Sequence, residues 1–381
     1  MLLMQTTDSK KRIVLLDSFR CLAILFVMFY HFTYRWTSPH SPINLYPYEN
    51  WYGNVFEYGL LGVSFFFIIS GFVISFTLEG TESISAFFKN RFIRLFPPML
   101  LCTVITFFAV HFLDKELLFP PLHKAKNFLP SLTFISPALL EKIFAVKFDW
   151  LNGSYWSLWV EIQFYIISSL IYYANKKRYF TNILIACLFI TLVGRVLLNI
   201  CGSNLLHVPV SDVTRKEILT WVDVFSIMVY SQFFALGVLF HKVYKERKLS
   251  GALSLLLGIL TCLNAFVYAQ SIAEYVVIGI MFILFCLMVY KPSAIQFLNN
   301  PLFIRIGVLS YTIYLIHEPI GILSIKHFGA YLGSLSPLAP WIMITLIILF
   351  AELSYRVYEK HSIRFLKKLL FKPTPVEKTR V

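Results

Sequence analysis

The stretch DSFRCLAILFVMFYHF, residues 17–32, is an almost unbroken apolar run that contains three side chains able to carry charge, Asp17, Arg20 and His31. Apolar runs of about 18 or more residues, long enough to cross a bilayer, recur from this stretch almost to the end of the chain. Hydrophobic residues make up 58% of the 381 positions, whereas a soluble domain has about 45–50%. The pattern predicts an all-α polytopic membrane protein, because helices satisfy every backbone group in hydrocarbon and the alternating pattern of a barrel is absent.

About ten transmembrane helices are expected. The connection over residues 114–155, between the third and fourth helices, is long and rich in aromatic residues. Loops of this length are uncommon unless they are functional or disordered, and the apolar content argues against disorder. We therefore expect this connection to pack over the outer mouth of the helix bundle. The predicted spans are 13–33, 59–79, 96–113, 156–174, 180–200, 222–241, 251–269, 273–290, 303–323 and 339–358.

The distribution of Lys and Arg predicts the orientation. Alternate connections carry basic clusters, such as residues 10–12 and 176–178, and the short connections between them carry few basic residues. Because cytoplasmic loops are enriched in Lys and Arg, both termini are predicted to be cytoplasmic. We expect one transmembrane domain over residues 11–360 and a short basic cytoplasmic tail over residues 361–381. The last ten residues, KPTPVEKTRV, are expected to be disordered.

The charge pattern also excludes some classes of function. The formal net charge is +14, but the basic residues lie mostly in loops and at helix ends, and no basic face with stacking aromatics is evident, so no nucleic-acid partner is expected. The six cysteines are scattered without metal-ligand spacing, and no metal is expected. There is no Walker A, GxSxG, HExxH or dinucleotide fingerprint, so no tightly bound cofactor is expected either.

Arg20 and His31 are the first candidate functional pair. An ionisable residue within a spanning helix is costly and normally faces a protein interior. Eleven residues of α-helix rotate through three turns and about 20° and rise about 16 Å, so the two side chains share a face at different depths. Asp17 can pair with Arg20 at i, i+3. The structural alternative, with Arg20 reaching the interface and His31 simply hydrogen-bonded there, remains open.

The second candidate is RFIRLFPP, residues 91–98. Arg91 and Arg94 share one face at i, i+3, and two guanidinium groups form a fork suited to phosphate. The bias of positive residues toward the cytoplasm explains the same charges equally well. Pro97 and Pro98 are expected to help start the following helix.

The third candidate is NGSYWSLWVEIQFY, residues 152–165. Glu161 lies one to two turns into the apolar segment, and Ser154 or Ser157 is suited to cap the helix. If Glu161 lies near His31, its carboxylate stabilises the protonated imidazole. For His317 a structural role is favoured, because one histidine near an interface is easily satisfied. The supporting candidates are Asp17, Ser70, Trp156, Ser157, Tyr311 and His317.

Six pieces of sequence, in the same order, resemble the acyltransferase-3 family of integral membrane acyltransferases. Arg20 and His31 keep the family's spacing, whereas Ser18 stands where the family often has Gly. The resemblance implies transfer of an acyl group, usually acetyl, from cytoplasmic acyl-CoA to an acceptor hydroxyl, with His31 essential. The pieces are LLDSFRCLAILFVMFYHF (15–32), GLLGVSFFFIISGFVIS (59–75), FFKNRFIRLFPPML (87–100), YWSLWVEIQFYI (155–166), IGVLSYTIYLIHEPI (306–320) and LSYRVYEK (353–360).

Under this resemblance each candidate has an expected role. Arg91 and Arg94 hold the phosphates of acyl-CoA, the co-substrate, and Arg20 positions the pantetheine arm or thioester. His31 acts as a general base or carries the acyl group, with Glu161 or Asp17 as electrostatic support.

The expected acceptor is an envelope carbohydrate such as O-antigen or exopolysaccharide, or a polyprenyl-linked sugar, and the expected location is the bilayer of a bacterial inner membrane. Tyr155 and the tryptophans of the outer loop have rings suited to stack on sugars, although interfacial anchoring explains them equally well. A lipid or small-molecule acceptor stays open, as does a transporter or flippase of envelope precursors. The short tail is typical of a stand-alone member of the family.

Overall fold

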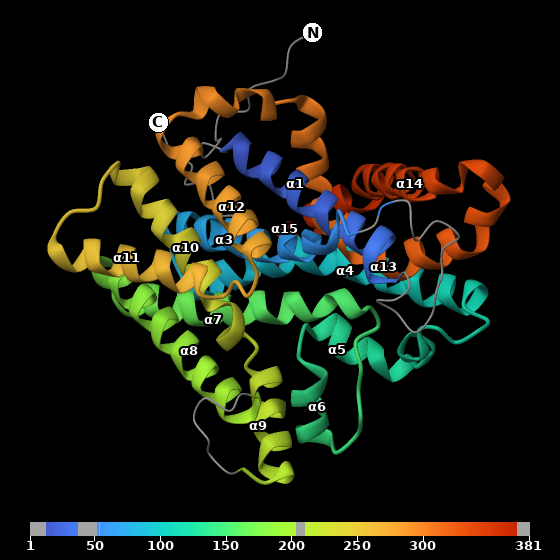
Figure 1. Cartoon of the computed structure of the whole chain (residues 1–381), viewed down its shortest axis with the longest axis horizontal. Helices are drawn as coiled ribbons and strands as arrows, with labels where there is room; N and C mark the ends of the chain where they lie inside the picture. Colours follow the sequence, from blue (N-terminus) through green and yellow to red (C-terminus); the bar gives the residue numbers. More distant parts are fainter. Residues whose placement is uncertain (1–12, 37–51, 53, 203–209, 372–381) are drawn as a thin grey trace, which may run out of the picture.

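The computed structural model describes residues 13–36, 52, 54–202 and 210–371, and all regular structure in this part is helical (Figure 1). The predicted all-α fold is therefore confirmed. The helices are α1 (Val14–Tyr30), α3 (Gly62–Glu79), α4 (Ile84–Leu113), α5 (Phe128–Thr133), α6 (Pro137–Phe144), α7 (Trp156–Ala174), α8 (Tyr179–Gly202), α9 (Asp212–Val224), α10 (Ile227–Glu246), α11 (Ala252–Phe266), α12 (Ile272–Tyr290), α13 (Pro301–Phe328), α14 (Ala339–Ser354) and α15 (Lys360–Leu370).

Each of the ten predicted spans overlaps a helix, and seven helical stretches of the described chain are long and apolar enough to cross a membrane. The chain is therefore an integral membrane protein. The total of ten spans and the orientation of the termini stay predictions. The seven stretches are Val14–Arg35, Glu57–Glu79, Ile84–Leu113, Lys176–Cys201, Asp212–Glu246, Ile272–Tyr290 and Pro301–Leu370.

Two predicted helix starts are wrong. Helix α4 begins at Ile84, not at residue 96, because Ser83 Oγ accepts a hydrogen bond from Ala86 N (3.2 Å) and caps it. Pro97 and Pro98 therefore lie inside α4 and do not start it. The predicted span 222–241 begins later, in α10, and the charged segment before it forms the separate helix α9.

The first part of the predicted basic tail is helical. Residues 360–370 form α15, an amphipathic basic helix, and Lys89 Nζ of α4 donates to the Leu370 carbonyl (3.3 Å). The segment KPTPVEKTRV and the basic cluster at residues 10–12 lie outside the described residues.

The connection over residues 114–155 packs on the bundle, as predicted. It contains α5, α6 and the 3₁₀ turns Pro120–His123, Ala125–Asn127 and Gly153–Tyr155. The ring of Phe128 lies 5.0 Å from that of Phe107 on α4, and Asn152 bonds to α13. The end of this connection therefore reaches the interior of the bundle.

Glycines allow a close helix crossing between α3 and α10. A Cβ on Gly71 would lie 2.1 Å from the Phe234 carbonyl oxygen, and one on Gly237 would lie 2.0 Å from the Ile68 carbonyl oxygen. The backbones can approach this closely because neither residue carries a side chain. This crossing fixes α3, which carries Ser70, at the centre of the bundle.

Replacing Gly237 by Ala is expected to destabilise the protein by about 1–3 kcal/mol, because the new methyl group overlaps backbone that cannot move away easily. Gly279→Ala is the matched control, since Gly279 lies in α12 and a methyl group added there would meet nothing within 4 Å. The control should be neutral or more stable, by up to about 1 kcal/mol, because Ala favours helix. Thermal unfolding in detergent measures both; equal melting temperatures would contradict the packing role of Gly237.

Candidate active site

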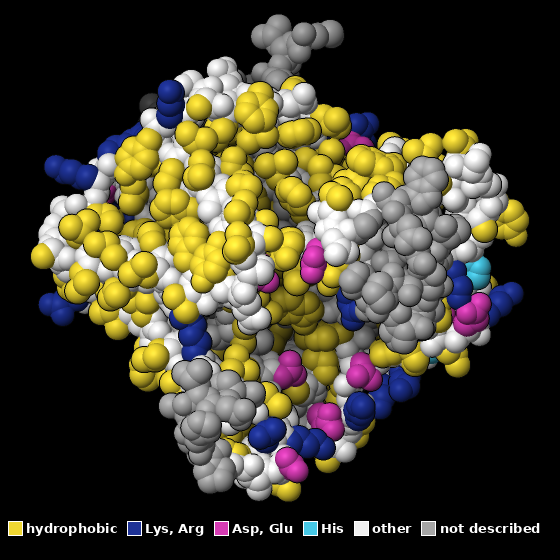
Figure 2. All heavy atoms as spheres, in the orientation of Figure 1, with side chains coloured by type: hydrophobic (Ala, Val, Ile, Leu, Met, Phe, Trp, Pro, Cys, Tyr) yellow, Lys and Arg dark blue, Asp and Glu magenta, His cyan; other side chains and the backbone are white. Residues whose placement is uncertain are grey.

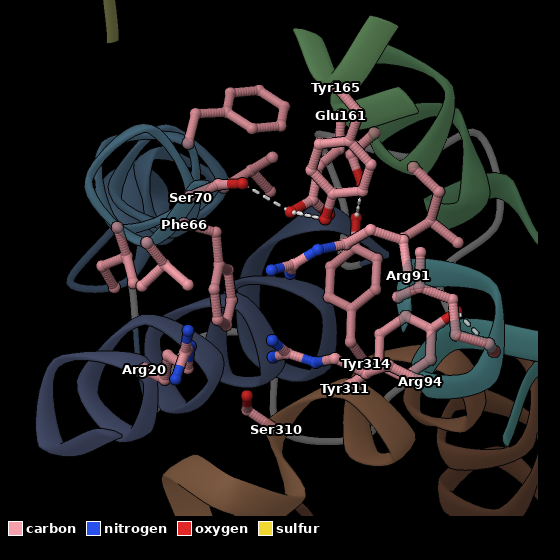
Figure 3. Close-up of a pocket in the computed structure, with 17 residues that line it drawn as sticks. Arg20, Phe66, Ser70, Arg91, Arg94, Glu161, Tyr165, Ser310, Tyr311 and Tyr314 are labelled. Carbon is pink, nitrogen blue, oxygen red and sulfur yellow. Dashed lines mark hydrogen bonds between the residues drawn. The ribbon is translucent and has the colours of Figure 1, made fainter. Parts of the chain in front are cut away.

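A pocket of about 710 Å³, open solvent included, lies between α1, α3, α4, α7 and α13 (Figure 3). We call it the arginine pocket. It brings together seven residues that the sequence had singled out from five separate segments. These residues are Arg20, Ser70, Arg91, Arg94, Ser157, Glu161 and Tyr311.

Three arginines dominate the arginine pocket, and Figure 3 shows their guanidinium groups turned toward one central space. Arg20 Nη1 pairs with Asp17 at 2.8 Å, at the predicted i, i+3 spacing. Arg91 is buried and donates to Thr77 Oγ1 (2.7 Å), but its Nε has no hydrogen-bond partner among the described residues. Arg94 has no hydrogen bond or ion pair to any described residue. A buried donor without a partner is costly, so the Nε of Arg91 is suited to an anionic ligand, and the exposed guanidinium of Arg94 can reach the same ligand.

Glu161 is the carboxylate of this pocket. It accepts hydrogen bonds from Ser70 Oγ and Tyr165 OH, both at 2.6 Å. Glu161 and Asp17 together carry two negative charges, and the three arginines carry three positive charges. The ionised groups of the pocket therefore have a net charge of +1. The prediction that Glu161 supports His31 is wrong, because α7 directs this carboxylate to α3 and the arginines.

His31 contacts a different carboxylate, Glu318, across the interface between α1 and α13. His31 Nε2 lies 3.5 Å from Glu318 Oε1, and His31 Nδ1 lies 3.2 Å from His317 Nε2. Glu318 and His317 are buried. His31 is the first residue of a π-helical turn, His31–Arg35, that follows α1, and such turns often occur at functional sites. We call His31, His317 and Glu318 the histidine–glutamate site.

The hydrogen-bond partners fix the tautomers of both histidines. His317 Nδ1 lies 2.8 Å from the Tyr314 carbonyl, which can only accept, so this nitrogen carries the proton and Nε2 is an acceptor. His31 Nδ1 faces that acceptor and the Val27 carbonyl (2.9 Å), so it carries the proton of His31. The free lone pair of neutral His31 is therefore on Nε2, beside Glu318. A proton taken up there is stabilised by the carboxylate.

A proline in α13 explains how Glu318 is held. Pro319 has no N–H, so the carbonyl of Leu315 loses its helical donor. Asn152 Nδ2 (3.0 Å) and Tyr155 OH (3.2 Å) donate to that carbonyl instead and anchor the start of α7 against α13. This anchoring places Ser154, one of the two residues between Asn152 and Tyr155, on Glu318.

Ser154 binds one oxygen of Glu318 and leaves the other for His31. Its backbone N (3.0 Å) and its Oγ (2.6 Å) both donate to Glu318 Oε2. Oε1 is the oxygen nearest His31. Ser154 is thus a positioning residue for the carboxylate.

Tyr314 connects the two sites. It lines the arginine pocket, its OH lies 2.8 Å from Ser157 Oγ, and its ring lies 5.5 Å from that of His317. A ligand that fills the pocket from the arginines to Tyr314 therefore ends one side chain away from the histidine–glutamate site. His317, for which a structural role was favoured, is the contact between Tyr314 and His31.

Sequence reasoning missed Glu318, Ser154, Tyr165 and Tyr314. A signal for Glu318 existed, because a carboxylate followed by proline inside an apolar helix is as costly as Arg20 or His31. No local pattern marks the two tyrosines, whose roles depend on which helices meet. Trp156 lies outside the arginine pocket, in a second cavity next to it.

Comparison with known proteins identifies the family of the chain. The acyltransferase-3 family model, described as an acyltransferase domain, matches residues 13–354. O-acetyltransferase OatA of Staphylococcus aureus (strain NCTC 8325 / PS 47) is 25% identical over 372 residues, which cover 90% of this chain and 56% of that protein. The putative O-acetyltransferase SACOL0978 of Staphylococcus aureus (strain COL) is 24% identical over 379 residues with the same coverage.

Acyltransferase MdmB of Streptomyces mycarofaciens is 29% identical over 119 residues, 31% of this chain and 30% of MdmB. The chain spans just over half the length of the Staphylococcus relatives. No solved structure matches this chain. The family model covers the whole site, from Arg20 on α1 and His31 just after it to Glu318 on α13, and the chain therefore belongs to the acyltransferase-3 family of integral membrane acyltransferases.

Proposed function

We propose that this protein is a membrane O-acyltransferase that moves an acyl group, in the first place acetyl, from cytoplasmic acyl-CoA to a hydroxyl of an envelope carbohydrate. The observation that carries the proposal is the connection of an arginine-lined pocket, through Tyr314, to a histidine with a free Nε2 beside a buried carboxylate. The name of the relative OatA, an O-acetyltransferase, supports acetyl and oxygen as donor group and acceptor atom. The bacterial inner membrane is the matching location.

Acyl-CoA is a suitable ligand for the arginine pocket because it is strongly anionic at one end and carries its thioester on a long neutral arm. Arg94, without a partner among the described residues, and Arg91, with a free Nε, bind the phosphates. Arg20, held by Asp17, contacts the arm from the opposite wall. Filling the pocket in this order brings the thioester to Tyr314.

At the histidine–glutamate site His31 acts as the general base. Its Nε2 takes the proton of the acceptor hydroxyl, and the oxygen attacks the thioester carbonyl. The C–O bond forms, the C–S bond breaks, and the CoA thiolate takes the proton back from the imidazolium. Glu318, rather than Glu161, stabilises the imidazolium between these two transfers.

Replacing Arg94 by Ala is expected to raise the KM for acyl-CoA by about 10- to 100-fold, the loss typical of a hydrogen bond to a charged group. The kcat at saturating acyl-CoA should change little, because Arg94 does not contact the reacting atoms. Arg178→Ala is the matched control, an exposed arginine in the α7–α8 connection. Steady-state kinetics in detergent give both constants, and a change confined to the acceptor KM would contradict the phosphate-binding role.

The proposed function as a whole is tested with purified protein, isotopically labelled acetyl-CoA and envelope oligosaccharides. Mass spectrometry should detect the label as an ester on the sugar, together with free CoA. Transport of an oligosaccharide into vesicles without ester formation would contradict the proposal.

A further inference from the structure

Beside the arginine pocket lies a second cavity, which we call the tryptophan groove. Three indole rings line it, together with a carboxylate and three hydroxyl groups, from the long connection, α7, α9 and the start of α10. We propose that this groove binds a sugar ring of the carbohydrate acceptor, an inference that rests on the proposed function. The lining residues used below are Trp150, Trp156, Trp159, Asp223, Ser226 and Tyr230.

The groove exists because α9 and α10 do not form one continuous helix. Helix α9 ends at Val224, and its carbonyl accepts from Trp159 Nε1 (2.8 Å) and Gln163 Nε2 (2.9 Å), both on α7. Gln163 Oε1 also accepts from Ile227 N, at the start of α10 (3.1 Å). Helix α7 therefore holds the break open, and Asp223 and Ser226 on either side of it face the tryptophans across the groove.

The chemistry of the groove fits a sugar. Aromatic faces pack on the C–H face of a pyranose ring, while carboxylate and hydroxyl groups bind its hydroxyls. Ligand sites commonly combine an aromatic lining with a few such polar groups. Trp159 is fixed by its hydrogen bond, and Trp156 is fixed against Tyr230, with ring centroids 5.0 Å apart. Among the described residues, the indole N–H groups of Trp150 and Trp156 have no acceptor. They are therefore free to donate to a ligand.

The groove lies where the charged end of the protein meets its apolar surface. Figure 2 shows Lys, Arg, Asp and Glu side chains gathered over the end formed by α6 and α9, and mostly hydrophobic side chains over α10 to α12. Lys142 of α6 pairs with Glu217 of α9 at 3.2 Å, in an exposed bridge. Helix α9 begins with four exposed charged residues, Asp212, Arg215, Lys216 and Glu217, so its outer end is suited to water rather than to the bilayer core. A hydrated glycan, rather than an acyl chain, matches this position.

The wall of the groove is continuous with the active site. Trp156 contacts Phe67, with ring centroids 6.3 Å apart, and Phe67 also lines the arginine pocket. The next residue, Ser157, lines that pocket, and Ser154, two residues earlier, holds Glu318. One short segment thus separates the groove from both the donor site and the base. A sugar in the groove can present the next residue of its chain to His31.

Two variants test the groove, Trp150→Ala and Asp223→Asn. Each is expected to raise the acceptor KM by about tenfold or more, as typical for losing an aromatic anchor or a hydrogen bond to a charged group. The KM for acetyl-CoA should not move. The probe is the pool of soluble oligosaccharides released from the envelope of the source organism by mild acid, with labelled acetyl-CoA as donor. Trp221→Ala is the matched control, an exposed tryptophan on α9 that does not line the groove.

The outcomes separate the groove from the proposed function. Wild-type transfer with an acceptor KM that stays within twofold in both groove variants would overturn the groove and leave the function standing. A donor KM that rises together with the acceptor KM would also overturn it, because the damage would then extend to the arginine pocket. A wild-type protein that hydrolyses acetyl-CoA but esterifies no sugar would overturn both.

Discussion

Replacing His31 by Ala is expected to lower the rate of acyl transfer by about 10²- to 10⁴-fold, the range typical of losing a general base. The variant loses the imidazole whose free nitrogen, Nε2, is placed beside Glu318. The arginine pocket is unchanged, because His31 does not line it. Acyl-CoA binding should therefore stay at the wild-type level while turnover is lost.

His111→Ala is the control for this prediction. His111 is exposed, and its Nδ1 lies 2.9 Å from the carbonyl of Phe107, four residues earlier. His31 makes the same local contact with Val27, so the two variants lose similar helix-surface interactions. Full transfer by His31→Ala, with folding checked by size-exclusion chromatography, would remove His31 from the mechanism.

Glu318→Gln is the second large expected effect, a fall in kcat of about 10²- to 10³-fold. Glutamine keeps the shape and can still accept from Ser154, but it carries no charge to stabilise the imidazolium. Its amide group also has hydrogens to donate toward His31 Nε2, which would occupy the lone pair that takes the proton. The KM for acyl-CoA should change little.

Glu161→Gln separates a specific role of Glu318 from a general loss of buried charge. It removes a carboxylate from the arginine pocket, where Ser70 and Tyr165 hold it. We expect that variant to change the KM for acyl-CoA more than the kcat. If both glutamate variants changed the same constant to the same extent, the assignment of Glu318 to the chemical step would be wrong.

Much of the site could be predicted from the cost of charge in a bilayer. Because of this cost, Arg20 and His31 on the first predicted helix and Arg91 and Arg94 before the third are predicted to be functional. The structure places the three arginines in one pocket. Applied to the predicted span 303–323, the same cost also selects Glu318. The sequence interpretation places His317 near an interface, where ionisable residues cost little, and so overlooks the neighbouring Glu318.

The partner of each charge could not be predicted, because it depends on which helices meet and in which register. Glu161 and Glu318 are both carboxylates near the predicted outer side, and nothing local says which one faces His31. Pro319 decides that Glu318 faces His31, because it leaves the Leu315 carbonyl without a helical donor. Asn152 and Tyr155 donate to this carbonyl instead, and Ser154 therefore reaches Glu318. The predicted start of α4 is wrong for a related reason, since prolines inside a transmembrane helix are tolerated where neighbouring groups satisfy the freed backbone.

We propose that donor binding and proton transfer occur at the two ends of one connected site. The most direct test measures acyl-CoA affinity and single-turnover acyl transfer on the same purified preparations of wild type, Arg94→Ala and His31→Ala. We expect Arg94→Ala to bind acyl-CoA weakly but to transfer at nearly the wild-type rate once saturated, and His31→Ala to bind normally but not to transfer. Loss of acyl-CoA binding in His31→Ala, or a saturated rate in Arg94→Ala as low as that of His31→Ala, would contradict the claim.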